Sequence, residues 1–203
     1  IADTERSNKK FEASKYKPIL LSGKTICVVG VGGIGREVGR VCSAVGMRVI
    51  GTRRSGENGN ADFEKIYPSH DLLKILPESD YVAICCQWTP DTEKLINREA
   101  FNAMKQDAVV INIARGEIID ETALIEALDG KKLRGVVLDV YRGEFDHAPN
   151  FRLWNDSRVL ITPHISAASD INSHKGNELF LKNLNRYLGG EELENIIDWK
   201  LGY

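Results

Sequence analysis

A glycine cluster between Gly30 and Gly35, with the sequence GVGGIG, most strongly constrains how this chain can fold. The cluster follows the apolar run Thr25–Val29 and precedes a helical pattern that runs from Ile34 to about Val45. Glycines at the spacing G-x-G-x-x-G permit a tight turn, and they let backbone N–H groups and a helix N-terminus approach a pyrophosphate. A second apolar run, Met47–Ile50, completes a strand–turn–helix–strand unit. The unit predicts a dinucleotide-binding site.

The rest of the chain repeats this alternation of Val/Ile-rich runs and helical patterns. Such a pattern indicates an α/β fold, a doubly wound parallel sheet of the Rossmann-like dinucleotide-binding type. The strands are expected at Thr25–Val29, Arg48–Gly51, Tyr81–Cys85, Ala108–Ile113, Val136–Val140 and Val159–Thr162. The helices are expected at 34–45, at 71–76, up to Met104 with Thr92 or Asn97 as the cap, from Asp120 to Gly130, and at 176–188.

The chain is expected to divide into three parts. Residues 1–22 are a lead-in segment, residues 23–166 the dinucleotide-binding domain, and residues 167–203 a C-terminal helix and tail. The chain opens on Ile1 within a polar segment, and we therefore expect it to be preceded by a further region. The 203 residues suit one large domain, or one domain with an appendage.

Composition excludes several classes of protein. The net charge of −2 comes from nearly balanced charges without a basic block, which argues against a nucleic-acid partner. The longest apolar runs have the length of strands, so no membrane partner is expected, and the N-terminus lacks a signal-peptide core. The four cysteines form no CxxC pair and indicate a reducing compartment, and no metal site is predicted. A cytoplasmic enzyme is expected.

The residues after the second strand predict which dinucleotide binds. NAD-binding members of this fold place an acidic residue there, to bind the ribose hydroxyls. Here the sequence is Gly51-Thr52-Arg53-Arg54-Ser55, without a carboxylate. The planar, charged side chains of Arg53 and Arg54 match a 2′-phosphate, and Ser55 could add a hydroxyl. NADP(H) is therefore the expected cofactor, with NAD(H) as a possible one and a solvated surface turn as the alternative.

Four charged or titratable residues follow later strands and are expected to converge on one edge of the sheet. They are Arg115, Asp139, Glu144 and His164. Each has an ordinary structural alternative: a surface ion pair, a cap, a solvated loop residue and a structural histidine, respectively. Together they suggest hydride transfer to a carbonyl beside a carboxylate, in which arginine grips the carboxylate and histidine moves the proton. A neighbouring carboxylate would orient the histidine and favour its protonated form.

Several segments resemble the D-isomer-specific 2-hydroxyacid dehydrogenase family. They are VVGVGGIG at 28–35, TPDTEKLIN at 89–97, MKQDAVVINIARGEIIDETALIEAL at 104–128, LRGVVLDVYRGE at 133–144, TPHIS at 162–166 and NRYLGGEEL at 185–193. The resemblance implies catalytic roles for Arg115 (substrate binding), Glu144 (partner of the histidine) and His164 (general acid/base). It implies cofactor contacts for the residues Gly30, Gly32, Gly33, Ile34, Gly35, Arg53, Arg54, Cys86, Gln87, Thr92, Ile113, Ala114, Arg115, Asp139 and His164.

The chain departs from this family in three places. Gly33 stands where the family often has a larger residue, and Phe145 stands where proline is usual. The substrate-binding region that precedes the cofactor domain in the family is also absent. With that region we expect a homodimer that acts on a small 2-hydroxy or 2-oxo acid, whereas this chain alone could be inactive. The alternatives are a non-catalytic dinucleotide-binding module, used in redox sensing or in interaction, and a truncated product without function.

Overall fold

The computed structural model describes residues 9, 14, 17–197 and 199 of the chain. These residues fall into two compact units, Ile1–Pro163 and His164–Tyr203, and each is described by itself. Most of the predicted lead-in 1–22 and the end of the tail, residues 200–203, lie outside the described residues. The predicted three-part division therefore stays a prediction.

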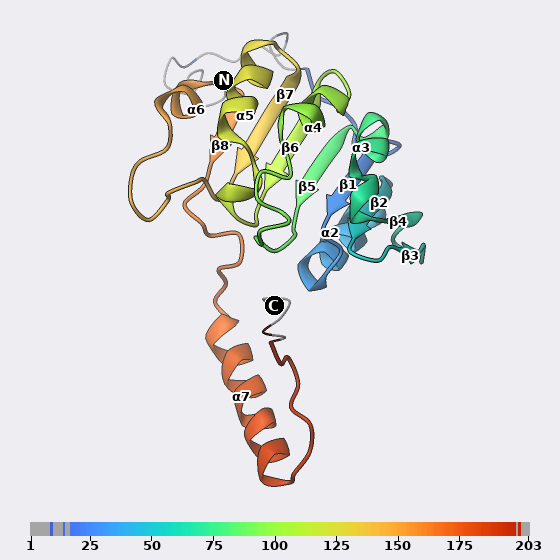
Figure 1. The fold of residues 1–203 in the computed structure, drawn as a ribbon, viewed down its shortest axis with the longest axis vertical. Helices are drawn as coiled ribbons and strands as arrows, with labels where there is room; N and C mark the ends of the chain where they lie inside the picture. Colours follow the sequence, from blue (N-terminus) through green and yellow to red (C-terminus); the bar gives the residue numbers. More distant parts are fainter. Residues whose placement is uncertain (1–8, 10–13, 15–16, 198, 200–203) are drawn as a thin grey trace. The chain divides into compact units, whose positions relative to one another are not determined.

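The first unit is built on one eight-stranded sheet (Figure 1). Seven strands run parallel in the order β4-β2-β1-β5-β6-β7-β8, and β3 adds an antiparallel edge beside β4. The strands are β1 Thr25–Val29, β2 Arg48–Arg53, β3 Glu57–Asn58, β4 Lys65–Pro68, β5 Tyr81–Ile84, β6 Ala108–Asn112, β7 Leu133–Leu138 and β8 Val159–Ile161. The predicted doubly wound α/β fold is confirmed.

The helices of the first unit begin and end at residues that suit those positions. Gly46, with a φ of +83°, follows α2, where a left-handed residue commonly ends a helix. The side chains of Asn97 and Asp120 accept backbone N–H groups at the starts of α4 and α5. Asn97 is thus the cap that the sequence left open against Thr92. The helices are α2 Gly33–Ala44, α3 Leu72–Ile75, α4 Arg98–Ala103, α5 Glu121–Asp129 and α6 Phe151–Asn155, with 3₁₀ turns at Ser69–Asp71, Leu76–Glu78 and Gly116–Ile118.

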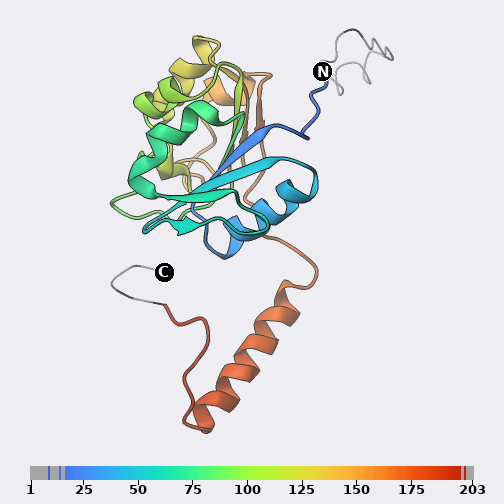
Figure 2. The same ribbon diagram turned by 90° about the vertical axis from the view of Figure 1, so that its right-hand side faces the viewer.

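At β1 the sheet is buried on both faces, and the residues of this strand alternate between them. Cys27 and Val29 pack in the core cluster that includes residues of α3, α4 and α5, whereas Ile26 and Val28 pack in the cluster with Phe63 and the α2 side chains. Figure 2 shows α2 on one side of the sheet and the helices α3 to α5 on the other. This explains why the strands are almost continuously apolar in sequence.

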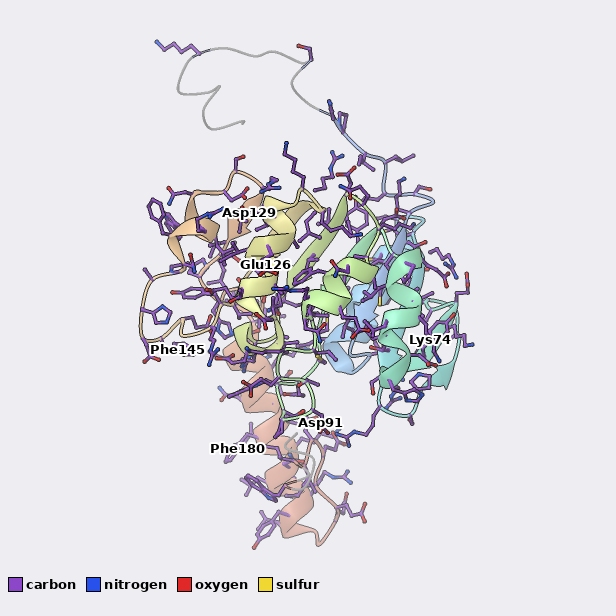
Figure 3. All side chains as sticks on the ribbon, turned by 45° about the horizontal axis from the view of Figure 1, so that its top comes forward. Lys74, Asp91, Glu126, Asp129, Phe145 and Phe180 are labelled. Atoms are coloured by element: carbon purple, nitrogen blue, oxygen red, sulfur yellow. The ribbon has the colours of Figure 1, made fainter. Side chains whose placement is uncertain are left out.

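Two ion pairs join the helices of the α5 side at the surface. Glu126 of α5 pairs with Arg98 of α4 at 2.5 Å, and Asp129 pairs with Arg152 of α6 (Figure 3). These groups are largely exposed, and each pair therefore contributes only about 0–1 kcal/mol to stability.

Most expected elements are present, with shifted ends. The strand expected at Val136–Val140 is β7, Leu133–Leu138, so Asp139 directly follows it. The strands β3 and β4 and the helix α6 were not expected. Of the four residues of β4, only Ile66 is fully buried, so the strand lacks an apolar pattern that would predict it. β4 belongs to the sheet through its parallel pairing with β2.

The second unit contains α7, Asn172–Leu188, four residues longer at its start than the predicted helix 176–188. The segment after α7 returns along it, since Asn183 exchanges two 2.9 Å hydrogen bonds with the backbone of Glu194, and Lys182 pairs with the Glu194 carboxylate. Large apolar side chains of this unit are exposed, among them Phe180 (Figure 3), Leu181, Leu184, Tyr187, Leu188, Ile196, Ile197 and Trp199. Among the described residues, no helix has the length and apolarity to cross a bilayer.

Candidate functional site

The candidate site lies where the parallel strands end at one edge of the sheet. The chain leaves β1 toward β2 on one side and later crosses to β5 on the other, so the order of the strands reverses between β1 and β5. Ligands of open α/β sheets bind at such a switch point, outside the carboxyl ends of the strands. The loops after β1, β2, β5, β6 and β7 therefore form the candidate site.

The glycine loop, Gly30–Gly35, is shaped by close backbone contacts. Gly30 has a φ of +97°, and a Cβ built on it would lie 2.5 Å from the backbone N and Cα of Cys86 in the loop after β5. A Cβ on Gly35 would lie 2.2 Å from the carbonyl oxygen of Gly30. At both positions only glycine avoids a clash, so the turn that leads into α2 depends on these two residues.

Some N–H groups of the glycine loop bond to the neighbouring strand, and others remain for a ligand. The N–H groups of Gly30 and Val31 donate to the carbonyl of Thr52 at 3.0 and 2.9 Å, which fixes the loop to β2. The amides that remain for an anion are those of the first turn of α2, at Gly33, Ile34 and Gly35. The first N–H groups of a helix have no intrahelical acceptor. A Cβ on Gly32 or Gly33 would meet nothing within 4 Å, so the space beside these two residues is open.

Exposed arginines follow at the end of β2. Arg53 is the last residue of the strand, paired with Pro68 of β4, and both Arg53 and Arg54 are exposed. The Ser55 hydroxyl donates to the carbonyl of Gly56 at 3.3 Å. The position that an NAD-type acidic residue would take is therefore cationic, and it lies one strand away from the glycine loop.

The loop after β5 is closed by Thr92. Its hydroxyl donates to the Gln87 carbonyl at 2.7 Å and accepts the Thr89 N–H at 2.8 Å, which holds the turn 87–92 together. Cys86 is half-buried, and burial raises the pKa of its thiol to about 11. A thiol with a raised pKa is mostly protonated at neutral pH, and Cys86 packs against the backbone of Gly30.

The loop after β6, Ile113–Gly116, carries Arg115, and we call it the arginine loop. Arg115 is exposed, and its Nη1 donates to the Ala114 carbonyl at 2.6 Å. The side chain of Asn112, which is fully buried at the end of β6, bonds to the backbone of this loop. Ile113 is half-buried, and Ala114 is buried. The guanidinium is thus presented to solvent from a backbone that is held at its base.

The residues after β7 supply two carboxylates. Asp139 is buried (2% exposed) and accepts a hydrogen bond from the Thr162 hydroxyl at 2.5 Å. Glu144 lies in the loop Val140–His147, which we call the glutamate loop, and is half-buried. The Tyr141 hydroxyl donates to the His147 carbonyl at 2.7 Å, and Gly143 has a φ of +77°, so this loop has a defined turn.

The structure brings the arginine loop and the glutamate loop together. A Cβ on Gly116 would lie 2.1 Å from the carbonyl carbon of Tyr141 and 2.2 Å from the backbone N of Arg142. The two backbones can approach this closely because residue 116 is glycine. Arg115 and Glu144 therefore belong to adjoining loops, although 29 residues separate them in sequence (144 − 115 = 29).

His164 opens the second compact unit, directly after Pro163. Its φ is +52°, in the left-handed region that few residues other than glycine adopt. The joining of His164 to Arg115 and Glu144 stays a prediction.

Two residues escaped the prediction from sequence, Asn112 and Thr162. Both act through hydrogen bonds to groups that were predicted, namely the arginine loop and Asp139. The signal for Asn112 was its place at the end of a buried strand just before a turn, where an Asn side chain can bond to backbone two residues on. Among the described residues, no group of three His, Cys, Asp or Glu side chains could hold a metal ion.

Comparison with known proteins identifies the family. The model of the D-isomer specific 2-hydroxyacid dehydrogenase NAD-binding domain matches residues 1–166. The chain belongs to this family. The resemblance seen in the sequence is confirmed.

Individual members of the 2-hydroxyacid dehydrogenase family resemble the chain in sequence and in structure. A glyoxylate reductase of Thermococcus kodakarensis is 36% identical over 87% of this chain and 52% of its own, and a D-3-phosphoglycerate dehydrogenase of Methanocaldococcus jannaschii is 31% identical over 93% and 36%. The NADPH-dependent glyoxylate/hydroxypyruvate reductase of Sinorhizobium meliloti, solved with NADP and sulfate, is 26% identical, with a TM-score of 0.86 over 100% of this chain and 63% of its own. The chain thus spans about half the length, or less, of the curated relatives it matches first.

Proposed function

We propose that the protein containing this chain is an oxidoreductase that transfers a hydride between NADP(H) and a small 2-hydroxy or 2-oxo acid. The observation that carries the proposal is the exposed guanidinium of Arg115, held at the carboxyl edge of the sheet and on a loop that adjoins the one carrying Glu144. The names of the relatives, reductases and dehydrogenases of 2-oxo and 2-hydroxy acids, support it and disfavour a non-catalytic module.

NADP(H) is the preferred cofactor, and NAD(H) is the weaker one. The fit rests on the open space above Gly32 and Gly33, on the amides at the start of α2, and on the exposed Arg53 and Arg54. Helix amides suit the pyrophosphate, and guanidinium groups suit the 2′-phosphate. The NADP-bound reductase of S. meliloti supports the same preference. Asp139 and the loop after β5 lie at the same edge, where the nicotinamide end would bind.

The chain's own residues then have distinct roles in the reaction. Arg115 binds the substrate carboxylate through paired N–H donors and thereby orients the carbonyl carbon. His164 donates a proton to the carbonyl oxygen during reduction, and it removes one in the reverse direction. Glu144 orients the imidazole of His164. NADPH, when bound, supplies the hydride that reduces the carbonyl carbon.

The C-terminal segment 167–203 belongs, in this proposal, to a substrate domain whose other part lies outside this chain. The exposed apolar side chains of α7 and the tail are suited to such packing. Residues 23–166 form the cofactor domain. We place the protein in the cytoplasm as a homodimer, on the basis of its unpaired cysteines and of the family's usual arrangement.

The proposal is tested by the rate at which full-length protein oxidises NADPH or NADH with glyoxylate, hydroxypyruvate or pyruvate. We expect turnover with NADPH, and we expect Arg115→Lys to lower kcat/KM roughly 100-fold, because an ammonium group cannot make the two-pronged contact. Arg98→Lys on α4 is the matched control and should leave kcat/KM unchanged. NADPH binding without reduction of any 2-oxo acid would instead identify a non-catalytic module.

A further inference from the structure

We propose that Asn112 is a positioning residue that sets the direction in which the Arg115 guanidinium leaves the sheet. The inference rests on the proposed function, since it assigns a second residue to the substrate-binding half of the same site. Asn112 is the last residue of β6 and is fully buried (0% exposed).

Both ends of the Asn112 carboxamide bond to the arginine loop. Its Oδ1 accepts the N–H of Ala114 at 3.0 Å, and its Nδ2 donates to the carbonyl of Arg115 at 2.9 Å. The side chain therefore spans consecutive residues and fixes the peptide between them. Because a buried polar group is strongly disfavoured when it is unpaired, the loop is held to this geometry by a penalty as well as by two bonds.

The same residue ties the arginine loop to the neighbouring strand end. The backbone carbonyl of Asn112 accepts the N–H of Asp139 at 2.9 Å. On its other side, the loop packs at Gly116 against the backbone of Tyr141 and Arg142. Asn112 thus fixes the base of the arginine loop within the group of loops that carries Asp139 and Glu144.

The position of the Ala114–Arg115 peptide matters because the Arg115 guanidinium donates a hydrogen bond to its carbonyl. The Nη1 of Arg115 donates to the Ala114 carbonyl at 2.6 Å, and this carbonyl belongs to the peptide that lies between the two backbone groups bonded to Asn112. A guanidinium that binds a carboxylate with two parallel bonds tolerates little rotation. A displacement of about 1 Å at such a group can reduce the rate 100-fold.

Only a side chain with one donor and one acceptor at this length satisfies both contacts. An aspartate keeps the acceptor for Ala114 but turns a negatively charged oxygen toward the Arg115 carbonyl. An alanine loses both bonds. The pair Asn112→Asp and Asn112→Ala therefore separates the contribution of the Arg115 contact from that of the whole amide.

The test is steady-state kinetics of full-length wild type, Asn112→Asp and Asn112→Ala with a 2-oxo acid and NADPH. We expect kcat/KM to fall roughly tenfold in N112D and roughly 100-fold in N112A, mainly through KM for the 2-oxo acid. The Kd for NADPH should stay within about threefold, because its phosphates bind at β1 and β2. Asn97→Ala, which removes an Asn-to-backbone bond at the start of α4, is the matched control for lost stability alone.

A second measurement does not need turnover. The rate at which phenylglyoxal modifies Arg115, followed by mass spectrometry, should rise in N112D relative to wild type, with Arg98 of α4 as the internal reference. If wild type reduces no 2-oxo acid, the proposed function fails, and the labelling rate alone decides the role of Asn112.

The role of Asn112 would be overturned by any of three results. One is a KM for the 2-oxo acid that stays within twofold of wild type in N112D and, where it folds, in N112A. Another is an unchanged rate of Arg115 modification. Kinetic losses that N97A reproduces at equal loss of melting temperature would likewise reduce Asn112 to a structural residue.

Discussion

The two ends of the candidate site are built in different ways. Near β1 and β2, the cofactor end is made of backbone: glycines without side chains, helix amides, and a loop fixed by two bonds to the Thr52 carbonyl. Near β6 and β7, the reaction end is made of side chains that hold other groups in place, with Asn112 on the arginine loop and Thr162 on Asp139. The cofactor end is therefore sensitive to added atoms, and the reaction end to removed ones.

In the proposed function, this difference follows from what each end would bind. A pyrophosphate is a large anion that can be met by N–H groups of the chain itself, provided that no Cβ stands in the way. A small 2-oxo acid must be oriented within a fraction of an ångström, which requires side chains locked by further hydrogen bonds. Four experiments test the contrast, from the largest expected effect to the smallest.

An added methyl group should break the cofactor end. Gly30→Ala places a Cβ 2.5 Å from the Cys86 backbone at a φ of +97°, so we expect a loss of about 2–3 kcal/mol in stability and loss of NADPH binding. Urea unfolding and NADPH titration measure both. Gly32→Ala is the control: its Cβ meets open space, so stability should change by less than about 1 kcal/mol while NADPH binding weakens. If Gly30→Ala and Gly32→Ala lowered stability equally, the close backbone contact at Gly30 would not be the cause of the loss.

Arg53 should be the exception at the cofactor end, since it acts through its side chain. Arg53→Ala should lower the preference for NADPH over NADH roughly 10- to 100-fold, the value of one charge-assisted hydrogen bond. The ratio of kcat/KM for the two cofactors measures this. Arg40→Ala removes an exposed arginine of α2 that pairs with Glu37, and it should leave the ratio unchanged. An unaltered ratio in the Arg53 variant would remove this residue from the cofactor site.

Removal of one hydroxyl should impair the reaction end. Thr162→Val keeps the shape of the side chain but loses the hydrogen bond to Asp139, which is 2% exposed, so we expect kcat/KM to fall roughly tenfold. Thr162→Ser retains the hydroxyl and should restore most of the activity. If Ser and Val behave alike, the hydroxyl does not position Asp139.

Asp80 lies at the amino ends of β1 and β5, away from the candidate site. Its substitution should change stability alone, and it serves as the reference for the other variants. Burial disfavours its charged form, but the Thr25 N–H at 2.9 Å and Lys105 at 3.0 Å outweigh this, and they lower the pKa of the Asp80 carboxyl. Asp80→Asn should cost about 1 kcal/mol at neutral pH and leave the Kd for NADPH unchanged.

The pH dependence of the Asp80 effect has a definite sign. Because the folded pKa lies below the ordinary value of 3.8, the stabilisation is present above that value and is lost as the pH falls through the folded pKa. Urea unfolding of wild type and D80N should therefore converge in acid. A difference that persists at the lowest pH would show that the carboxylate charge is not its cause.

Local contacts explain what could be predicted from the sequence. The glycine loop, its helix and the strand β1 involve residues within about twenty positions of one another, and their expected places agree with the structure. The caps Asn97 and Asp120 act on residues two or three positions further on. The sequence also showed that charged residues directly follow several strands. These residues were expected on one edge of the sheet, because parallel strands end on the same edge whatever their order.

The sequence by itself determined the fold class, the family and the glycine loop, since each rests on the spacing of residues near one another in the chain. Tertiary structure decided that β4 joins the sheet, that Gly116 seats the arginine loop against the glutamate loop, and that Asn112 and Thr162 hold Arg115 and Asp139. The physical reason is that each of these, apart from the local bonds of Asn112, depends on groups brought together only when distant strands pair.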